Sequence, residues 1–445
     1  MQVKKALLAS ALLVSAPTVW AEDLLQIYQA AVKQDPVYAA ATAAHRATQE
    51  KVPEGRAALL PNVNLSANTT WNEIDTQYRG STSLPFPAGM RKYNSNGYTV
   101  MLDQPIVRMQ NYAQYAQAKQ QAAAGDAQLT DAQQNLVLRV AQAYFDYLLA
   151  QDGVNLAEAQ KKAIAEQLEI AKKSFEVGTS TITDTNEAQA RFDLINAQEI
   201  AAQQDLAVKR QQLVSLTGQL PGELLPLSAQ FAAKSEEPAS VDAWLQDAMA
   251  GNPQLRAQQA NVEIARQEVK KSQAGHLPTL DLVASYSDNG AGNSTFGVGT
   301  DTTAKTVGLQ LNIPLYAGGG ISARAREAVA GEDQARANLE GTRRQVELNV
   351  KQSFLDTQSS LLRVKALEQA LVSAQSALDS NKLGFQVGVR TSADVLNAQQ
   401  QYYSARHDLQ AARYQWILAD LRLRAAAGKL GQADLARVNG YLGKS

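Results

Sequence analysis

The segment at 395–426 reads VLNAQQQYYSARHDLQAARYQWILADLRLRAA and repeats its apolar residues with a period of seven. One large apolar residue recurs every seven positions, and one alanine follows three places after each of them. The large members are Val395, Tyr402, Leu409, Trp416 and Leu423, and the small members are Ala398, Ala405, Ala412, Ala419 and Ala426. This stripe predicts a long helix that packs knobs-into-holes in a left-handed coiled coil.

A second long helix is predicted just before this segment. From Ile321 to Leu383 there is no proline, and glycine occurs only at Gly331 and Gly341. Because a globular helix averages only about a dozen residues, a helix of this length must pack against others along its course. An earlier segment has a weaker apolar seam, formed by Ala188, Phe192, Ile195, Ala202, Leu206, Leu213 and Leu216. The seams alone fit a coiled-coil rod as well as the wall of a channel.

The chain contains an internal tandem repeat. The sequence Phe175-Glu176-Val177-Gly178 recurs 210 residues later as Phe385-Gln386-Val387-Gly388, and Asp184 matches Asp394 at the same spacing. Further pairs lie upstream: Asp35-Pro36 with Asn252-Pro253, Leu60-Pro61 with Leu277-Pro278, and Pro105-Ile106 with Pro314-Leu315. We therefore predict a first structural repeat at 22–230 and a second at 231–445.

Each predicted repeat contains a helix, a pair of strands and then long helices. The opening helices are expected over about 23–57 and about 240–275, and each ends at a Leu-Pro pair. Polar and apolar residues then alternate with the period of two that is typical of half-buried strands. The strands are expected at about 61–75, 93–106, 279–288 and 303–315, with loops at roughly 76–92 and 288–303.

The strands favour a channel over a plain rod, because a rod needs no amphipathic strands. Four strands cannot close a membrane barrel alone, since open edges in lipid leave backbone groups unpaired. Three chains together would supply about twelve strands, an even number that membrane barrels use.

The N-terminus predicts export. Lys4 and Lys5 precede an apolar run from Ala6, and Val19-Trp20-Ala21 has the small residues of a cleavage site, so residues 1–21 are predicted to be a signal peptide. The formal net charge of −1 gives no bias toward nucleic acid. The chain has no cysteine, and its histidines, His45, His276 and His407, form no ligand-spaced cluster. We expect no metal, no cofactor, no nucleic-acid partner and no enzymatic activity.

Four stretches resemble the TolC family of outer-membrane channels, in order and in spacing. They are Glu22–Ala30, Gly275–Leu282, Ile313–Gly319, and Val387–Thr391 together with Asp394–Leu396, and the resemblance covers about 22–440. The resemblance implies a homotrimer of mixed fold in the cell outer membrane, in contact with its lipid. A transmembrane β-barrel with four strands per protomer, twelve-stranded in the trimer, would continue into a periplasmic coiled-coil tunnel of long helices.

The function that the resemblance implies is a non-enzymatic exit duct for type I protein secretion, multidrug efflux or both. The duct would open at its periplasmic aperture when an inner-membrane transporter of ABC or RND type docks with a periplasmic adaptor. The alternative is a periplasmic coiled-coil adaptor or scaffold without a pore.

The resemblance also implies a latch at the closed aperture. The positions that match the family's contacts are Thr183, Asp184, Phe385 and Arg390. A guanidinium can bind a carboxylate through two charge-assisted hydrogen bonds, so Arg390 is expected to contact Asp184. The closest relatives usually have a tyrosine at the position of Phe385, so we expect one latch hydrogen bond to be missing.

Two acidic rings are the family's usual lining at the narrowest point. Asp394 matches the first ring, whereas Asn397 occupies the second, where an aspartate is usual. Three chains would then present three carboxylates and not six, so we expect weaker cation selectivity and weaker block by multivalent cations. The alternative for Asp394 is a solvated surface carboxylate, or a charge at a helix N-terminus near Thr391-Ser392.

Overall fold

The computed structural model describes residues 22–79, 88–228, 230–234, 238–293 and 297–443. The predicted signal peptide lies outside these residues. The chain forms two compact units. The helical unit comprises residues up to 40, 132–250 and 347 onward, and the sheet-bearing unit comprises 41–131 and 251–346.

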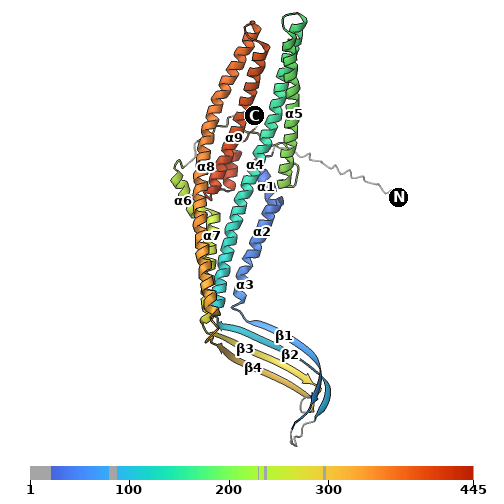
Figure 1. Cartoon of the computed structure of the whole chain (residues 1–445), viewed down its shortest axis with the longest axis vertical. Coiled ribbons are helices and arrows are strands. Elements are labelled where there is room, and N and C mark those ends of the chain that lie inside the picture. Colours follow the sequence, from blue (N-terminus) through green and yellow to red (C-terminus); the bar gives the residue numbers. More distant parts are fainter. Residues whose placement is uncertain (1–21, 80–87, 229, 235–237, 294–296, 444–445) are drawn as a thin grey trace, which may run out of the picture. The chain divides into compact units, whose positions relative to one another are not determined.

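The sheet-bearing unit contains one antiparallel sheet in the order β1-β2-β3-β4 (Figure 1). The strands are β1 (Asn62–Thr76), β2 (Gly89–Val107), β3 (Thr279–Ala291) and β4 (Thr300–Asn312). All four predicted strands are present, but β2, β3 and β4 extend further into the loops than the sequence indicated. The expected end of the last strand at 315 is wrong, since β4 stops at Asn312, two residues before Pro314, which has no N–H for the ladder.

The two faces of this sheet differ in polarity. The register pairs Val63 with Leu102, Leu102 with Ala284 and Ala284 with Val307, which places these side chains on one face. Val307 is 79% exposed and Leu65, on the same face, is 70% exposed. The opposite face has polar residues such as Asn64, Ser66, Ser285 and Thr306. Within the described residues, β1 and β4 form the open edges of the sheet.

The helices that open each repeat are each broken before a proline, at Asp35 and at Asn252. The first is divided into α1 (Leu24–Gln34), α2 (Pro36–Gln49) and α3 (Lys51–Ala57), and the second into α6 (Val241–Gly251), α7 (Pro253–Gln273) and a short 3₁₀ turn, η1 (Ala274–His276). The prediction of single helices over 23–57 and 240–275 is therefore wrong. Asp35 and Asn252 have ψ of 119° and 124°, because the following proline excludes the helical conformation.

The helical unit contains two long helical hairpins (Figure 1). The first joins α4 (Met109–Glu176) to α5 (Ile182–Thr217), and the second joins α8 (Gly320–Gln386) to α9 (Ser392–Ala426); α10 (Gln432–Asn439) follows. α4 and α8 also extend into the sheet-bearing unit. The predicted seam of α9 is confirmed: Val395, Leu409, Trp416 and Leu423 are buried, and Tyr402 is half-buried.

The main core of the helical unit lies far from the hairpin turns. It includes Leu24 of α1, Tyr144 of α4, Trp416 of α9 and Leu435 of α10, all buried. Asp420, 1% exposed, accepts hydrogen bonds from Arg424 and from Arg437 of α10, which satisfies its buried charge. None of the described helices has the length and the apolar character needed to cross a membrane.

Candidate functional site

The two hairpins end in turns with the same backbone design. Gly178 follows α4 with φ of 75°, and Gly388 follows α8 with φ of 81°. Only glycine adopts this left-handed conformation without steric cost. The amide of Thr179 donates to the carbonyl of Ser174 (2.8 Å), and the amide of Val389 donates to the carbonyl of Gly384 (2.9 Å). These Schellman-type bonds end both helices in the same way.

Both returning helices begin with a capping box. In α5 the Thr181 hydroxyl accepts from the amide of Asp184 (3.3 Å), and the Asp184 carboxylate accepts from the Thr181 amide (3.0 Å). In α9 Thr391 and Asp394 repeat this pair of bonds at 3.2 and 2.9 Å. The sequence pattern Thr-x-x-Asp therefore fixes both helix starts.

Hydrogen bonding stabilises the charged form of both aspartates. The hydroxyl of Ser180 and both the amide and the hydroxyl of Thr181 hold the pKa of Asp184 below its usual value. The amide and hydroxyl of Thr391, with a smaller contribution from Arg390, lower the pKa of Asp394. Both groups are therefore anionic at neutral pH.

The four predicted latch residues lie at these turns. Thr183 is exposed in the first turn of α5, next to the capping residue Asp184. Phe385, which matches Phe175 of the first repeat, is half-buried in the last turn of α8. Arg390 is exposed and lies just before Thr391, the N-cap of α9. Within the described residues of one chain, Arg390 and Asp184 form no ion pair with each other. The contact between them thus stays a prediction.

Gly384 provides space for Arg390, and sequence reasoning missed it. A Cβ atom built on Gly384 would lie 2.6 Å from the Cγ of Arg390, which is too close for any side chain. The first repeat has Ser174 and Ser180 at the matching positions. The paired change from two serines to glycine and arginine is the signal that could have found this contact.

The two predicted ring positions differ in their surroundings. The Asp394 carboxylate caps α9, as the structural alternative expected, and it stays solvent-accessible. The side-chain oxygen of Asn397 accepts a hydrogen bond from Nη2 of Arg191 (2.8 Å). Nη1 of the same arginine donates to Oε1 of Gln400 (2.6 Å). Arg191 of α5 was not singled out from the sequence, because no local motif marks it.

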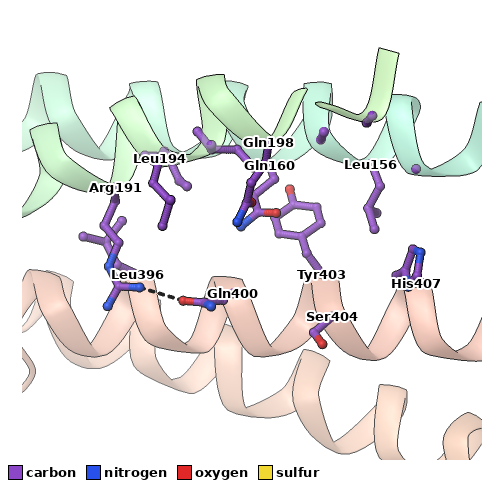
Figure 2. Close-up of a pocket in the computed structure, with 15 residues that line it drawn as sticks. Leu156, Gln160, Arg191, Leu194, Gln198, Leu396, Gln400, Tyr403, Ser404 and His407 are labelled. Carbon is purple, nitrogen blue, oxygen red and sulfur yellow. Dashed lines mark hydrogen bonds between the residues drawn. The ribbon is translucent and has the colours of Figure 1, made fainter. Parts of the chain in front are cut away.

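Below the turns, the first hairpin packs against α9. A small apolar cluster joins α4, α5 and α9 through Ile164, Leu168, Ala171, Ala188, Ile195 and Leu396. Gln167 of α4 donates a buried hydrogen bond to the hydroxyl of Ser392 (3.0 Å). Beyond Arg191 the packing opens into a pocket of about 370 Å³, and Figure 2 shows Arg191 and Gln400 at one end of it and His407 at the other.

A duplicated unit of amphipathic strands and long helical hairpins is the architecture of outer-membrane exit ducts. The family model described as "Outer membrane efflux protein" matches residues 27–219 and 244–429, one segment in each repeat. The chain belongs to this family, and it is a TolC-family channel protein.

Particular relatives resemble the chain over nearly its whole length. It is 35% identical to outer membrane protein TolC of Vibrio cholerae, over 95% of this chain and 94% of that protein. It is also 35% identical to the alkaline protease secretion protein AprF of Pseudomonas aeruginosa, over 94% of this chain and 87% of that protein. The fold matches the CmeC outer membrane channel of Campylobacter jejuni with a TM-score of 0.78, at 14% identity and over 100% of this chain and 98% of that one.

These relatives confirm the function and the location expected from the sequence. The chain is an outer-membrane exit duct with a periplasmic tunnel, of the kind that serves secretion and efflux. They give no support to the alternative of a periplasmic adaptor without a pore. As in the rest of the family, its role is transport.

Proposed function

We propose that three copies of this chain assemble into one duct that passes proteins, small molecules or both across the outer membrane. The observation that carries the proposal is the four-stranded sheet. It has an apolar face, a polar face and two open edges, β1 and β4. A sheet with these properties needs other chains to complete it.

The apolar face would contact lipid and the polar face would line the pore. Leu65, Val307, Leu309 and Leu311 are 61–79% exposed and lie on the same face of the sheet. Contiguous exposed apolar surface is rare on soluble monomers, whereas alternating lipid-facing and water-facing residues are typical of membrane barrels. Asn, Ser and Thr on the other face hydrogen-bond readily with water.

The open edges would pair β1 of one copy with β4 of the next. Each edge strand presents unpaired backbone N–H and C=O groups, and in lipid every such group needs an internal partner. Closing the sheet with three copies gives about twelve strands and removes all edges.

The hairpin turns would form the periplasmic aperture. In this assembly Arg390 of one copy contacts Asp184 of a neighbour, with Thr183 and Phe385 beside them as the rest of the latch. Asp394 from each copy forms the acidic ring. The anionic state of both aspartates supports these contacts, since a guanidinium binds a carboxylate and not a carboxylic acid.

An inner-membrane transporter and a periplasmic adaptor would dock at the aperture and open it. The relatives include AprF, named for alkaline protease secretion, PrtF of Dickeya chrysanthemi, named for protease secretion, and BepC of Brucella suis, named an efflux protein. The candidate partners are transporters of ABC or RND type, as the family resemblance implies.

The direct test is to reconstitute the purified protein in a planar bilayer. Discrete conductance steps, together with a trimer mass in detergent, support the duct. Persistent silence across voltages and salt concentrations, with the protein shown to be inserted, would favour the adaptor alternative. Deletion of the gene in its host and mass spectrometry of the culture supernatant then identify the cargo. Loss of a few large proteins indicates type I secretion, and an unchanged supernatant indicates efflux.

A further inference from the structure

We propose that Arg191 is a gating residue of this duct, which locks the first hairpin to the second within one chain. The proposal rests on the proposed function, because it assigns a role at the periplasmic aperture. It concerns a residue outside the four latch positions and the two ring positions that the family resemblance provides.

The geometry of Arg191 is that of a two-pronged clamp. The residue lies on α5 of the first hairpin, and its two terminal nitrogens donate to Asn397 (2.8 Å) and Gln400 (2.6 Å) of α9 in the second hairpin. The two acceptors are three residues apart, so they lie on one face of α9 about one turn from each other. A planar guanidinium fits such a pair of acceptors, whereas an ammonium group donates from a single point.

The clamp is partly shielded and has little competition from its own helix. The Arg191 side chain is 29% exposed. The carboxylate of Glu187, one turn earlier on α5, is 4.0 Å away, at the limit of an ion pair. The shorter bonds therefore join Arg191 to the other hairpin.

The packing next to Arg191 determines how much its hydrogen bonds contribute to holding the two hairpins together. Toward the hairpin turns lies the part of the small apolar cluster formed by Leu168, Ala171 and Ala188. On the other side lies the pocket of about 370 Å³ between α4, α5 and α9 (Figure 2). Tyr403 of α9 lines this pocket, and its hydroxyl donates to the carbonyl of Ala159 on α4 (3.2 Å). The bonds from Arg191 at the end of the pocket therefore hold α9 in place together with this one. Any opening that moves α9 away from α5 must break them.

The clamp also changes what position 397 does. The Asn397 oxygen is engaged by a cation of the same chain, so this position is part of a contact between hairpins. An aspartate there would form an ion pair with Arg191 and would have its charge largely compensated. The Asn397→Asp variant should therefore close the duct more tightly and add little to cation block. This expectation differs from the one based on two acidic rings.

The test is single-channel recording of the full-length protein in planar bilayers, with hexaamminecobalt(III) as the blocking cation. We expect Arg191→Gln to raise the ratio of open to closed time about tenfold, the effect of losing charge-assisted hydrogen bonds at a partly exposed site. Arg191→Lys should fall between the wild type and Arg191→Gln. Asn397→Asp should lower the open fraction, and block should strengthen only when it is combined with Arg191→Gln.

Lys161→Gln is the matched control. Lys161 has a similar exposure, 33%, and pairs with Glu199 at 2.7 Å, but this ion pair joins α4 to α5 within the first hairpin. Its loss should leave the open fraction unchanged. Arg191 variants that conduct with the wild-type open fraction would overturn this inference and leave the proposed function standing. Silence of the wild-type protein would overturn the proposed function and the inference with it.

Discussion

The turn of the first hairpin and the turn of the second share one backbone and differ in chemistry. Both have a left-handed glycine, Gly178 or Gly388, and a Thr-x-x-Asp capping box. Just before the cap, however, the first turn has Ser180, whose hydroxyl donates to Asp184 (2.7 Å). The second turn has Arg390 at the same position. The first turn is thus closed on itself, whereas the second presents a cation.

The same division continues one turn further along the returning helices. Glu187 of the first repeat matches Asn397 of the second. Arg191 approaches both side chains, at 4.0 Å from the Glu187 carboxylate and 2.8 Å from the Asn397 oxygen. A duplicated sequence has therefore kept the residues that shape the backbone and changed those that make contacts. The residues that the two turns share shape the backbone, and the residues that differ make contacts. Substitutions at matched positions can test this division.

The largest effect is expected from exchanging the residues before the two caps. Arg390→Ser removes the cation of the second turn, and a hydrogen bond to a charged group contributes about 1.5–3 kcal/mol. We expect the ratio of open to closed time in planar bilayers to rise by roughly tenfold or more. Ser180→Arg in the first turn should change it little. Equal effects of the two substitutions would show that the turns are not specialised.

The glycines should behave alike in both turns. Gly178→Ala and Gly388→Ala each force a side chain into the left-handed conformation, which costs about 1–2 kcal/mol. Hydrogen exchange of the turn peptides, followed by mass spectrometry, should show faster exchange by a similar factor at both. Gly331→Ala, in open space within α8, is the control and should stabilise its helix by about 0.5–1 kcal/mol. A clear difference between the two turns would contradict their shared design.

A smaller effect is expected from adding a hydroxyl to the matching phenylalanines. Phe385→Tyr would add a hydroxyl at the proposed latch, and one neutral hydrogen bond contributes about 0.5–1.5 kcal/mol. We expect the open fraction of the resting duct to fall by a few-fold. Phe175→Tyr in the first repeat serves as the matched substitution and should have no such effect. An unchanged open fraction in Phe385→Tyr would mean that the missing hydroxyl does not matter.

The smallest effect is expected when the pH is lowered. The folded-state pKa of Asp184 and that of Asp394 lie below the ordinary value, so each cap contributes stability at neutral pH that is lost as pH falls through the folded-state pKa. Protection of both turns from hydrogen exchange, corrected for the intrinsic rate, should stay level down to about pH 4 and decline below it. Asp184→Asn should flatten this decline in the first turn only. Loss of protection already near pH 6 would exclude these carboxylates as its cause.

Much of the fold could be predicted from the sequence, because its helices, strands and repeat each produce a periodic pattern of residues. The seven-residue stripe of α9, the alternation in the strands and the repeat of 210 residues all have direct structural meaning. The breaks at Asp35 and Asn252 were missed although the Asp-Pro and Asn-Pro pairs were visible. The apolar pattern continues across such a break, whereas the helical conformation of the backbone stops at the residue before proline.

The positions of the candidate site could be predicted only through the family resemblance. The Thr-x-x-Asp pattern also marks the capping boxes of Asp184 and Asp394, but only a charge at a helix N-terminus, at Asp394, was expected. The space that Gly384 leaves for Arg390 and the bonds from Arg191 to Asn397 depend on which helices lie side by side. Residues 206 positions apart in the chain carry no mark of that contact in a single sequence.

The most direct test of the central claim, that the hairpin turns form the constriction of the duct, uses a single introduced thiol. The chain has no cysteine, so Asp394→Cys provides one reactive site per copy. A bulky thiol reagent added on the aperture side should reduce the conductance in up to three steps. The same reagent should have little effect on Ser359→Cys, an exposed site far along α8 from the turn. Complete labelling of Asp394→Cys, confirmed by mass, with no loss of conductance would contradict the account.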